Sequence, residues 1–285
     1  MTLFARRASA ILYNLLRTRR DPRPFLLPAN VCPIVPATFA EARQPVEFID
    51  IAEPSLELDA AQCIDRLRAA PGGYSGVLFV HPYGSEHHPA SFFAAVREVT
   101  SDILIIDDKC LCRPSFDITS GADVTLYSTG RAKYVDRGGG GFAHVADGIA
   151  CDEATGGADW LELGPPAFDP DEYRQQVEAE ARAMDEQKAR LNAIYERELP
   201  PEICLPSSLQ RWRFSIRVPE SGRLIEAIFA AGLFASRHFP AAAGSFPVAA
   251  RLQAEIVNLF NDRYFDEQSA LRITRIVLQH LAGVR

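Results

Sequence analysis

The chain has 285 residues, of which 47% are hydrophobic and 24% charged, proportions typical of a soluble globular protein. Acidic residues outnumber basic ones by 37 to 30, and the formal net charge of −7 argues against a general nucleic-acid-binding protein, which carries a basic excess. No apolar run reaches the length of about eighteen residues that a membrane span requires, so we expect no contact with a membrane.

The first twenty residues contain five arginines and no acid, a composition that also occurs in targeting peptides. The apolar stretch from Ala8 to Leu16 is short, is followed by more arginines and has no small-residue cleavage site. We therefore expect an amphipathic first helix. The six cysteines lack the spacing of a disulfide framework, so we expect a cytoplasmic protein with reduced thiols.

The first half of the chain alternates short apolar runs with helical patterns. The predicted strands are Phe25 to Leu27, Val46 to Ile51, Gly76 to Val80, Ile103 to Ile106 and Val124 to Tyr127. Helical spacing occurs at about 33–43, 58–70 and 89–99. Continuous apolar strands separated by helices are typical of a mostly parallel central sheet with helices on both faces, an α/β architecture. We predict that this domain covers residues 1–165.

The second half has a different pattern. After a loop at about 147–170, residues 171–198 predict one long charged helix, which begins after Asp169 and Pro170, residues suited to a helix start. A strand is predicted over Trp212 to Val218. Helices are predicted at about 222–232, 248–260 and 267–283. These elements predict a smaller C-terminal α+β domain over residues 166–285.

Polar residues follow three of the predicted parallel strands, where ligands bind in α/β sheets. These clusters are His81 to Ser85, Asp107 to Cys110, and Ser128 to Lys133. A carboxylate, a hydroxyl and a lysine at one sheet edge suit pyridoxal 5'-phosphate. A lysine forms its Schiff base, a carboxylate keeps its pyridine nitrogen protonated, and hydrogen-bond donors bind its phosphate.

Lysine is rare in this chain, since only Lys109, Lys133 and Lys188 are lysines among 30 basic residues. Arginine stays protonated and is a poor nucleophile, so each lysine is a candidate for chemistry. We expect Lys109 to be a structural or solvent-facing charge. Lys188 lies in a stretch dense in glutamate and arginine, which predicts a solvated helix face.

Four collinear segments carry a resemblance to a known family. The run LYSTGRAKYVDRGGGGFA resembles the signature of DegT/DnrJ/StrS-type aminotransferases, in which a serine, a lysine and a glycine-rich turn follow one another. ILIIDDKC, VLFVHPYG and LLPANVCPIVPATFAEARQPVEFIDI resemble three further segments of the family in order and spacing, over residues 5–145. WRFSIRV and the final helices, including His238 to Pro240, are more loosely similar.

The resemblance implies the fold of the type I pyridoxal-phosphate transferases. It also implies an aminotransferase that moves an amino group from glutamate or glutamine to a keto-sugar or similar small ketone. Its partners would be this small-molecule substrate, the amino donor and a second copy of the chain, because family active sites lie at the interface of a homodimer.

The resemblance also implies roles for individual residues. Lys133 matches the Schiff-base lysine, which also moves the proton during transfer. Asp108 matches the carboxylate that pairs with the pyridinium nitrogen, and Ser128 matches a hydroxyl that binds the phosphate. His81 to Gly84 lie where the family's loop approaches the ring oxygen of the cofactor.

Some family positions are not matched. The Ser-Gly-Thr phosphate motif falls on Arg6, Arg7 and Ala8, where Arg7 is a candidate substitute because a guanidinium binds phosphate bidentately. Leu111 stands at the position of a glutamine or histidine. The position that stacks on the cofactor ring falls at about Asn30 to Cys32, where no residue is aromatic.

These departures keep two alternatives open. One is a catalytically silent homologue that binds a partner or ligand on the same scaffold. The other is a pyridoxal-phosphate enzyme with a different reaction on an amino acid. Lys133 argues against the sugar-dehydrating branch of the family, which has a histidine at this position.

Two other patterns are given structural interpretations. Cys110 and Cys112, with His87 and His88 nearby, depart from zinc-site spacing, so we expect no metal. The glycine run 138–141 fits neither nucleotide-binding pattern and predicts a tight turn between strands.

Overall fold

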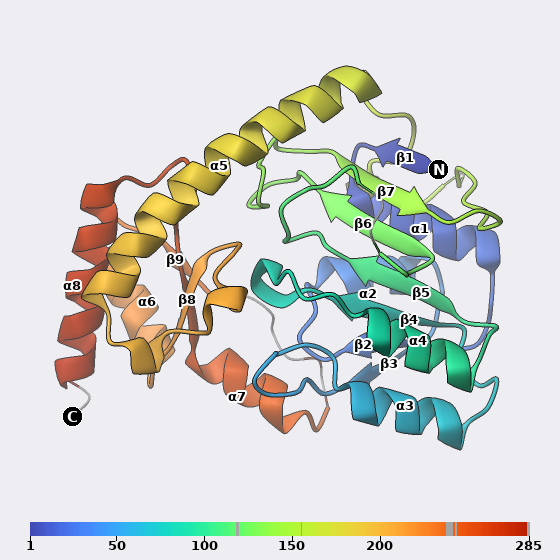
Figure 1. Ribbon diagram of the computed structural model, residues 1–285, viewed down its shortest axis with the longest axis horizontal. Helices are drawn as coiled ribbons and strands as arrows, with labels where there is room; N and C mark the ends of the chain where they lie inside the picture. Colours follow the sequence, from blue (N-terminus) through green and yellow to red (C-terminus); the bar gives the residue numbers. More distant parts are fainter. Residues whose placement is uncertain (118–119, 155, 238–241, 243, 284–285) are drawn as a thin grey trace.

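The computed structural model describes residues 1–117, 120–154, 156–237, 242 and 244–283. Its centre is a seven-stranded sheet with the order β1-β7-β6-β5-β4-β2-β3 (Figure 1). The strands are β1 (Thr2–Ala5), β2 (Phe25–Pro28), β3 (Val46–Ile49), β4 (Gly76–Val80), β5 (Leu104–Asp108), β6 (Val124–Ser128) and β7 (Gly141–Val145). Strands β2 to β6 run parallel, and β7 pairs antiparallel with both β6 and β1. The predicted mostly parallel sheet is therefore confirmed.

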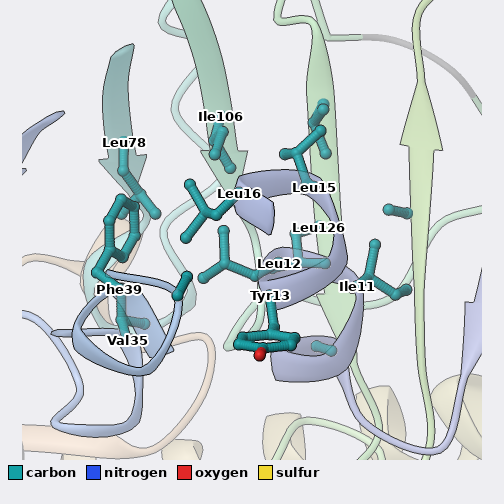
Figure 2. Close-up of a cluster of buried hydrophobic side chains, with 14 of the residues drawn as sticks. Ile11, Leu12, Tyr13, Leu15, Leu16, Val35, Phe39, Leu78, Ile106 and Leu126 are labelled. Atoms are coloured by element: carbon teal, nitrogen blue, oxygen red, sulfur yellow. The ribbon is translucent and has the colours of Figure 1, made fainter. Parts of the chain in front are cut away.

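Helices cover both faces of this sheet. They are α1 (Ala8–Arg19), α2 (Ile34–Glu41), α3 (Ala60–Ala69) and α4 (Ala90–Val99). Side chains alternate between the two faces along each strand. Leu78 and Ile106 therefore pack against α1 and α2 (Figure 2), whereas their chain neighbours pack in a separate cluster with α3 and α4. The predicted α/β layers are thus present.

The C-terminal part contains a second, smaller sheet. Its elements are α5 (Pro170–Glu198), β8 (Phe214–Arg217), α6 (Ser221–Ala230), β9 (Ala235–Ser236), α7 (Pro247–Glu255), β10 (Ile256–Leu259) and α8 (Glu267–Gly283). The strands pair antiparallel in the order β8-β10-β9, and α5 runs from the β1–β7 side of the large sheet to α8 (Figure 1). None of the helices in the described ranges is both long and apolar enough to cross a membrane.

The predicted helix at 248–260 is wrong in its second half. Helix α7 ends at Glu255, and Ile256 to Leu259 form the fully buried central strand of the small sheet. A short apolar run fits a buried helix or a buried strand equally well, so periodicity does not separate them. Strands β1 and β7 are not predicted by the sequence pattern. The similarity suggested for His238 to Pro240 lies outside the described residues.

The glycine run is not the predicted tight turn between strands, because residues 129–140 form a longer loop between β6 and β7 and the run occupies only its end and the first position of β7. The run has a different role. A Cβ at Gly141 would lie 2.4 Å from the backbone nitrogen of Ala8, the first residue of α1. Gly140 has φ +94°, and its N–H donates to the Arg6 carbonyl at 2.6 Å. The chain that enters α1 therefore lies against β7 at a distance that only glycine allows.

We predict that Gly141→Ala destabilises the protein by about 1–3 kcal/mol, because the added methyl overlaps backbone that cannot move aside freely. Gly139→Ala is the matched control, since its Cβ would meet the Arg6 carbonyl oxygen at an ordinary 3.6 Å. Urea denaturation of both variants measures the difference. Equal stabilities would show that the approach of α1 to β7 does not constrain the fold.

Candidate functional site

A cavity of about 380 Å³ lies at the carboxyl-terminal ends of the central parallel strands. This volume falls in the range of about 300–1,000 Å³ that small-molecule sites occupy. Its walls come from the ends of β4, β5 and β6, the start of α1, the region around α2 and the loop after β6. The five residues singled out in the sequence all line it: Arg7, His81, Asp108, Ser128 and Lys133.

Asp108 is the last residue of β5, and strand alternation turns it toward the cavity. It shares the α1 face with Leu104 and Ile106, whereas its neighbour Asp107 faces the opposite side. Asp108 is 6% exposed, and its Oδ1 accepts the backbone N–H of Cys110 at 2.9 Å. Burial, and then the Asp108 carboxylate, raise the pKa of the Cys110 thiol, so this cysteine stays neutral.

Asp107 and His81 form a buried pair behind the cavity. His81 Nε2 lies 2.7 Å from Asp107 Oδ1, and His81 Nδ1 lies 2.9 Å from the Ser85 carbonyl oxygen. Burial alone would raise the pKa of Asp107, but the hydrogen bond and charge of His81, with Lys109 and Ser120, hold it below its ordinary value. Both ring nitrogens of His81 thus face protein acceptors. His81 lines the cavity without a nitrogen left for a ligand.

Lys133 lies in the loop between β6 and β7. Its backbone N–H closes a turn onto the Gly130 carbonyl, and the residue before it, Ala132, has a left-handed φ of 59°. The positive charge of Lys133 opposes the rise in the pKa of the Cys110 thiol, and both residues line the cavity. Lys109, in contrast, is mostly buried beside Asp107 at 3.7 Å, so its expected structural role is confirmed. Within the described ranges, the Lys133 ammonium has no hydrogen bond or ion pair.

Another part of the cavity wall suits an anion. Ser128, at the end of β6, is 8% exposed and accepts the Gly130 N–H at 3.3 Å. Helix α1 begins here, with no side-chain cap and no acid in its first turn. The positive end of its dipole favours negative charge, although the Ala10 N–H already donates to the Arg7 carbonyl at 3.1 Å.

Ser9, in the first turn of α1, also lines the cavity and was not among the residues predicted. It lies one position beyond Arg6 to Ala8, where the family motif falls. A serine in the first turn of a predicted helix is the signal that could have identified it.

Arg7 lines the cavity, but its guanidinium already has a partner. Arg7 Nε donates to Glu162 Oε1 at 2.6 Å, and a second guanidinium nitrogen donates to the same oxygen. Both side chains are close to half exposed. Binding of a phosphate by Arg7 remains a prediction, and it requires the guanidinium to bind the anion beside Glu162 or to leave it.

Solved structures resemble this chain over nearly its whole length. A DegT DnrJ EryC1 StrS aminotransferase from Brucella abortus matches 98% of this chain and 85% of its own, with a TM-score of 0.75 at 16% identity. DesI, crystallised in the presence of its TDP-sugar product, matches 97% and 79%, with a TM-score of 0.78 at 17% identity. Spr1654 from Streptococcus pneumoniae, named as a sugar aminotransferase and solved in its PMP-form, matches 96% and 86%, with a TM-score of 0.75 at 14% identity.

The chain has the fold of the DegT/DnrJ/EryC1/StrS aminotransferases. The resemblance seen in four sequence segments is thereby confirmed at the level of the fold. No protein-family model matches the sequence. No curated protein matches it either.

The departures from the aminotransferase pattern form the apolar wall of the cavity. Leu111 lines it, is 7% exposed, and packs with Tyr83 and Trp212. Val31 and Cys32 line the side where the family's ring-stacking residue is expected, while the Asn30 amide donates to a backbone carbonyl. His81 is the only aromatic residue among the described lining residues.

The prediction for Lys188 is wrong, because this residue is buried and only 5% exposed. Its Nζ donates to the Trp212 carbonyl and to Asn261 Oδ1, and lies 4.9 Å from the centre of the Tyr134 ring. Helix α5 is charged on most sides, so its sequence does not reveal that one face packs against Trp212 and the loop after β10. Burial lowers the pKa of Lys188 to about 7.

This pKa predicts a pH dependence of stability. Below pH 7, Lys188 is protonated in the folded and unfolded chain, and the full cost of burying the charge applies. Above pH 7 the folded chain releases the proton while the unfolded chain keeps it up to about pH 10.5, so this cost falls as pH rises.

We therefore predict that the free energy of unfolding of the wild type, relative to Lys188→Met, increases between pH 7 and 9 by up to about 1.4 kcal/mol per pH unit. Groups common to both proteins cancel in this difference. Arg190→Met, at an exposed position on the same helix, is the control and should leave the slope unchanged. If the difference in the free energy of unfolding between the wild type and Lys188→Met does not change with pH, the lowered pKa of Lys188 is contradicted.

Proposed function

We propose that this protein is a pyridoxal-phosphate-dependent aminotransferase that transfers an amino group from glutamate or glutamine to a keto-sugar or similar small ketone. One observation carries the proposal. A lysine without a partner in the described structure, a buried carboxylate and an uncapped helix N-terminus with two nearby serines line one cavity, on a fold shared with aminotransferases.

The lining residues fit the cofactor chemically. Lys133 is the amine that would bind it covalently, and Asp108 is the carboxylate that would hold a proton on its ring nitrogen. Ser9, Ser128 and the first N–H groups of α1 would hold its phosphate. When bound, pyridoxal phosphate withdraws electrons from the substrate carbon that carries the amino group.

The protein's own groups would perform the proton transfers. The Lys133 amine, once released, would act as a base that takes a proton from the substrate carbon and delivers it to the cofactor carbon from which the amine was released. The Asp108 carboxylate would bind the ring nitrogen, and the Cys110 N–H orients it. Apolar side chains, among them Leu111 and Leu126, form part of the wall around these groups.

The substrate class is supported by the similar structures rather than by the cavity itself. DesI was crystallised with a TDP-sugar product, and Spr1654 is named as a sugar aminotransferase. We accordingly propose a keto-sugar substrate and a homodimer as the working assembly.

A second candidate is a catalytically silent protein that binds a ligand on the same scaffold. The pairing of Arg7 with Glu162 and the apolar side chain of Leu111 favour it, because both remove polar contacts that a phosphorylated cofactor could use. The next experiment separates the two candidates.

Addition of pyridoxal phosphate to the purified protein should produce an absorbance band that borohydride abolishes, leaving the cofactor attached to Lys133 in a peptide map. Lys133→Ala and Lys133→Arg should both lack the band, because neither side chain reacts with the aldehyde at this position. Lys133→Arg retains the positive charge and serves as the matched control for lost electrostatics. A folded wild type without the band at saturating cofactor would favour the silent scaffold.

Asp108→Asn should bind the cofactor but lower kcat by about 100-fold or more, since the amide lacks the charge that holds the ring proton. The measurement is steady-state transamination with a keto-sugar and glutamate, together with the absorbance band as a test of occupancy. Unchanged kcat would remove Asp108 from the mechanism.

A further inference from the structure

Trp212 connects the C-terminal part to two loops of the cavity. It lies just before β8 and is 1% exposed. Its indole N–H donates to the Ala132 carbonyl at 2.8 Å, and its backbone N–H donates to the Tyr83 carbonyl at 2.9 Å. One residue thus holds the loop after β6 and the loop after β4 from outside the large sheet.

Ala132 is the residue before Lys133, and its backbone needs this support. Its φ of 59° lies in the left-handed region, which costs a non-glycine residue about 1–3 kcal/mol unless the surroundings fix it. Trp212 fixes its carbonyl, and Asp136 Oδ2 accepts its N–H at 2.8 Å. The orientation of this peptide determines the direction from which the Lys133 side chain leaves the backbone.

Helix α5 holds the residue on the other side of Lys133. The Tyr134 hydroxyl donates to Asp185 Oδ1, and the Lys188 ammonium lies over the Tyr134 ring. Lys188 also donates to the Trp212 carbonyl. Lys188 therefore contacts one chain neighbour of Lys133, Tyr134, directly, and reaches the other, Ala132, through Trp212.

We propose that Trp212 and Lys188 are positioning residues for Lys133, which they act upon through Ala132 and Tyr134. Neither residue lines the cavity that Lys133 enters. The proposal rests on the proposed function for its catalytic consequence, whereas the placement of the loop can be tested without cofactor.

The test compares Trp212→Phe and Lys188→Met with Tyr195→Phe. Phenylalanine keeps an apolar ring but removes the N–H that binds Ala132. Tyr195 is the matched control because it lies on α5, is fully buried, and donates one hydrogen bond to a backbone carbonyl, that of Phe260 at 2.8 Å. Its removal changes the C-terminal core without touching the Lys133 loop.

Two measurements are made on each protein. Thermal unfolding of the same proteins shows which variants have comparable stability and can be compared with each other. Hydrogen–deuterium exchange of the amides of residues 130–136 should rise about tenfold in Trp212→Phe and Lys188→Met, and remain at the wild-type rate in Tyr195→Phe. The rate at which added pyridoxal phosphate reacts with Lys133, and kcat, should fall about tenfold in the same two variants. The KM for the amino donor should stay unchanged.

The outcomes separate the two proposals. Exchange and reaction rates in Trp212→Phe and Lys188→Met that equal those of Tyr195→Phe at matched stability would overturn the positioning role. A wild type that never reacts with the cofactor would overturn the proposed function. Loop exchange would then still decide whether Trp212 and Lys188 fix the segment around Lys133.

Discussion

The approach of the chain entering α1 to the start of β7 is the constraint on which the site depends. Gly141 leaves no room for a side chain beside Ala8, and Gly140 binds the Arg6 carbonyl. These contacts bring the uncapped first turn of α1 to the edge where β4, β5 and β6 end. They thereby place the positive end of the α1 dipole at the cavity.

The three lysines of the chain differ in their surroundings, and these surroundings determine which groups each ammonium contacts. Lys109 lies beside Asp107 in the buried His81 pair, and Lys188 is enclosed by Trp212 and Asn261. Lys133 alone combines partial burial in the cavity with an ammonium that no described group binds. Rarity in the sequence marks all three as candidates, and the resemblance singles out Lys133. Packing then shows that protein groups bind both Lys109 and Lys188.

The sequence pattern predicts features that depend on neighbouring residues, such as where a strand ends. It does not predict contacts between elements that are distant along the chain. The strand ending in Asp107 and Asp108 is readable because apolar residues precede two acids, and strand alternation then gives the acids different surroundings. The side-chain partner of His81, Asp107, and the hydrogen-bond partners of Lys188 lie 24 to 73 residues away along the chain, and no local periodicity encodes them. The strand Ile256 to Leu259 was hidden for the same reason, since only its pairing with β8 and β9 distinguishes it from the end of a helix.

Leu111 is apolar because it lies where the large sheet and the C-terminal part pack against each other. Leu111 packs in one cluster with Tyr83 and Trp212, and this cluster continues into Leu209 and Ile256 of the C-terminal part. Burial of apolar surface stabilises such a joint by about 25 cal/mol per Å², whereas a polar side chain here would need a partner in the cavity. Leu111 therefore strengthens the packing around Trp212, the residue that holds the loop of Lys133. A leucine at position 111 thus leaves the cavity wall without a polar side chain there, and at the same time packs against the residue that supports the backbone next to Lys133.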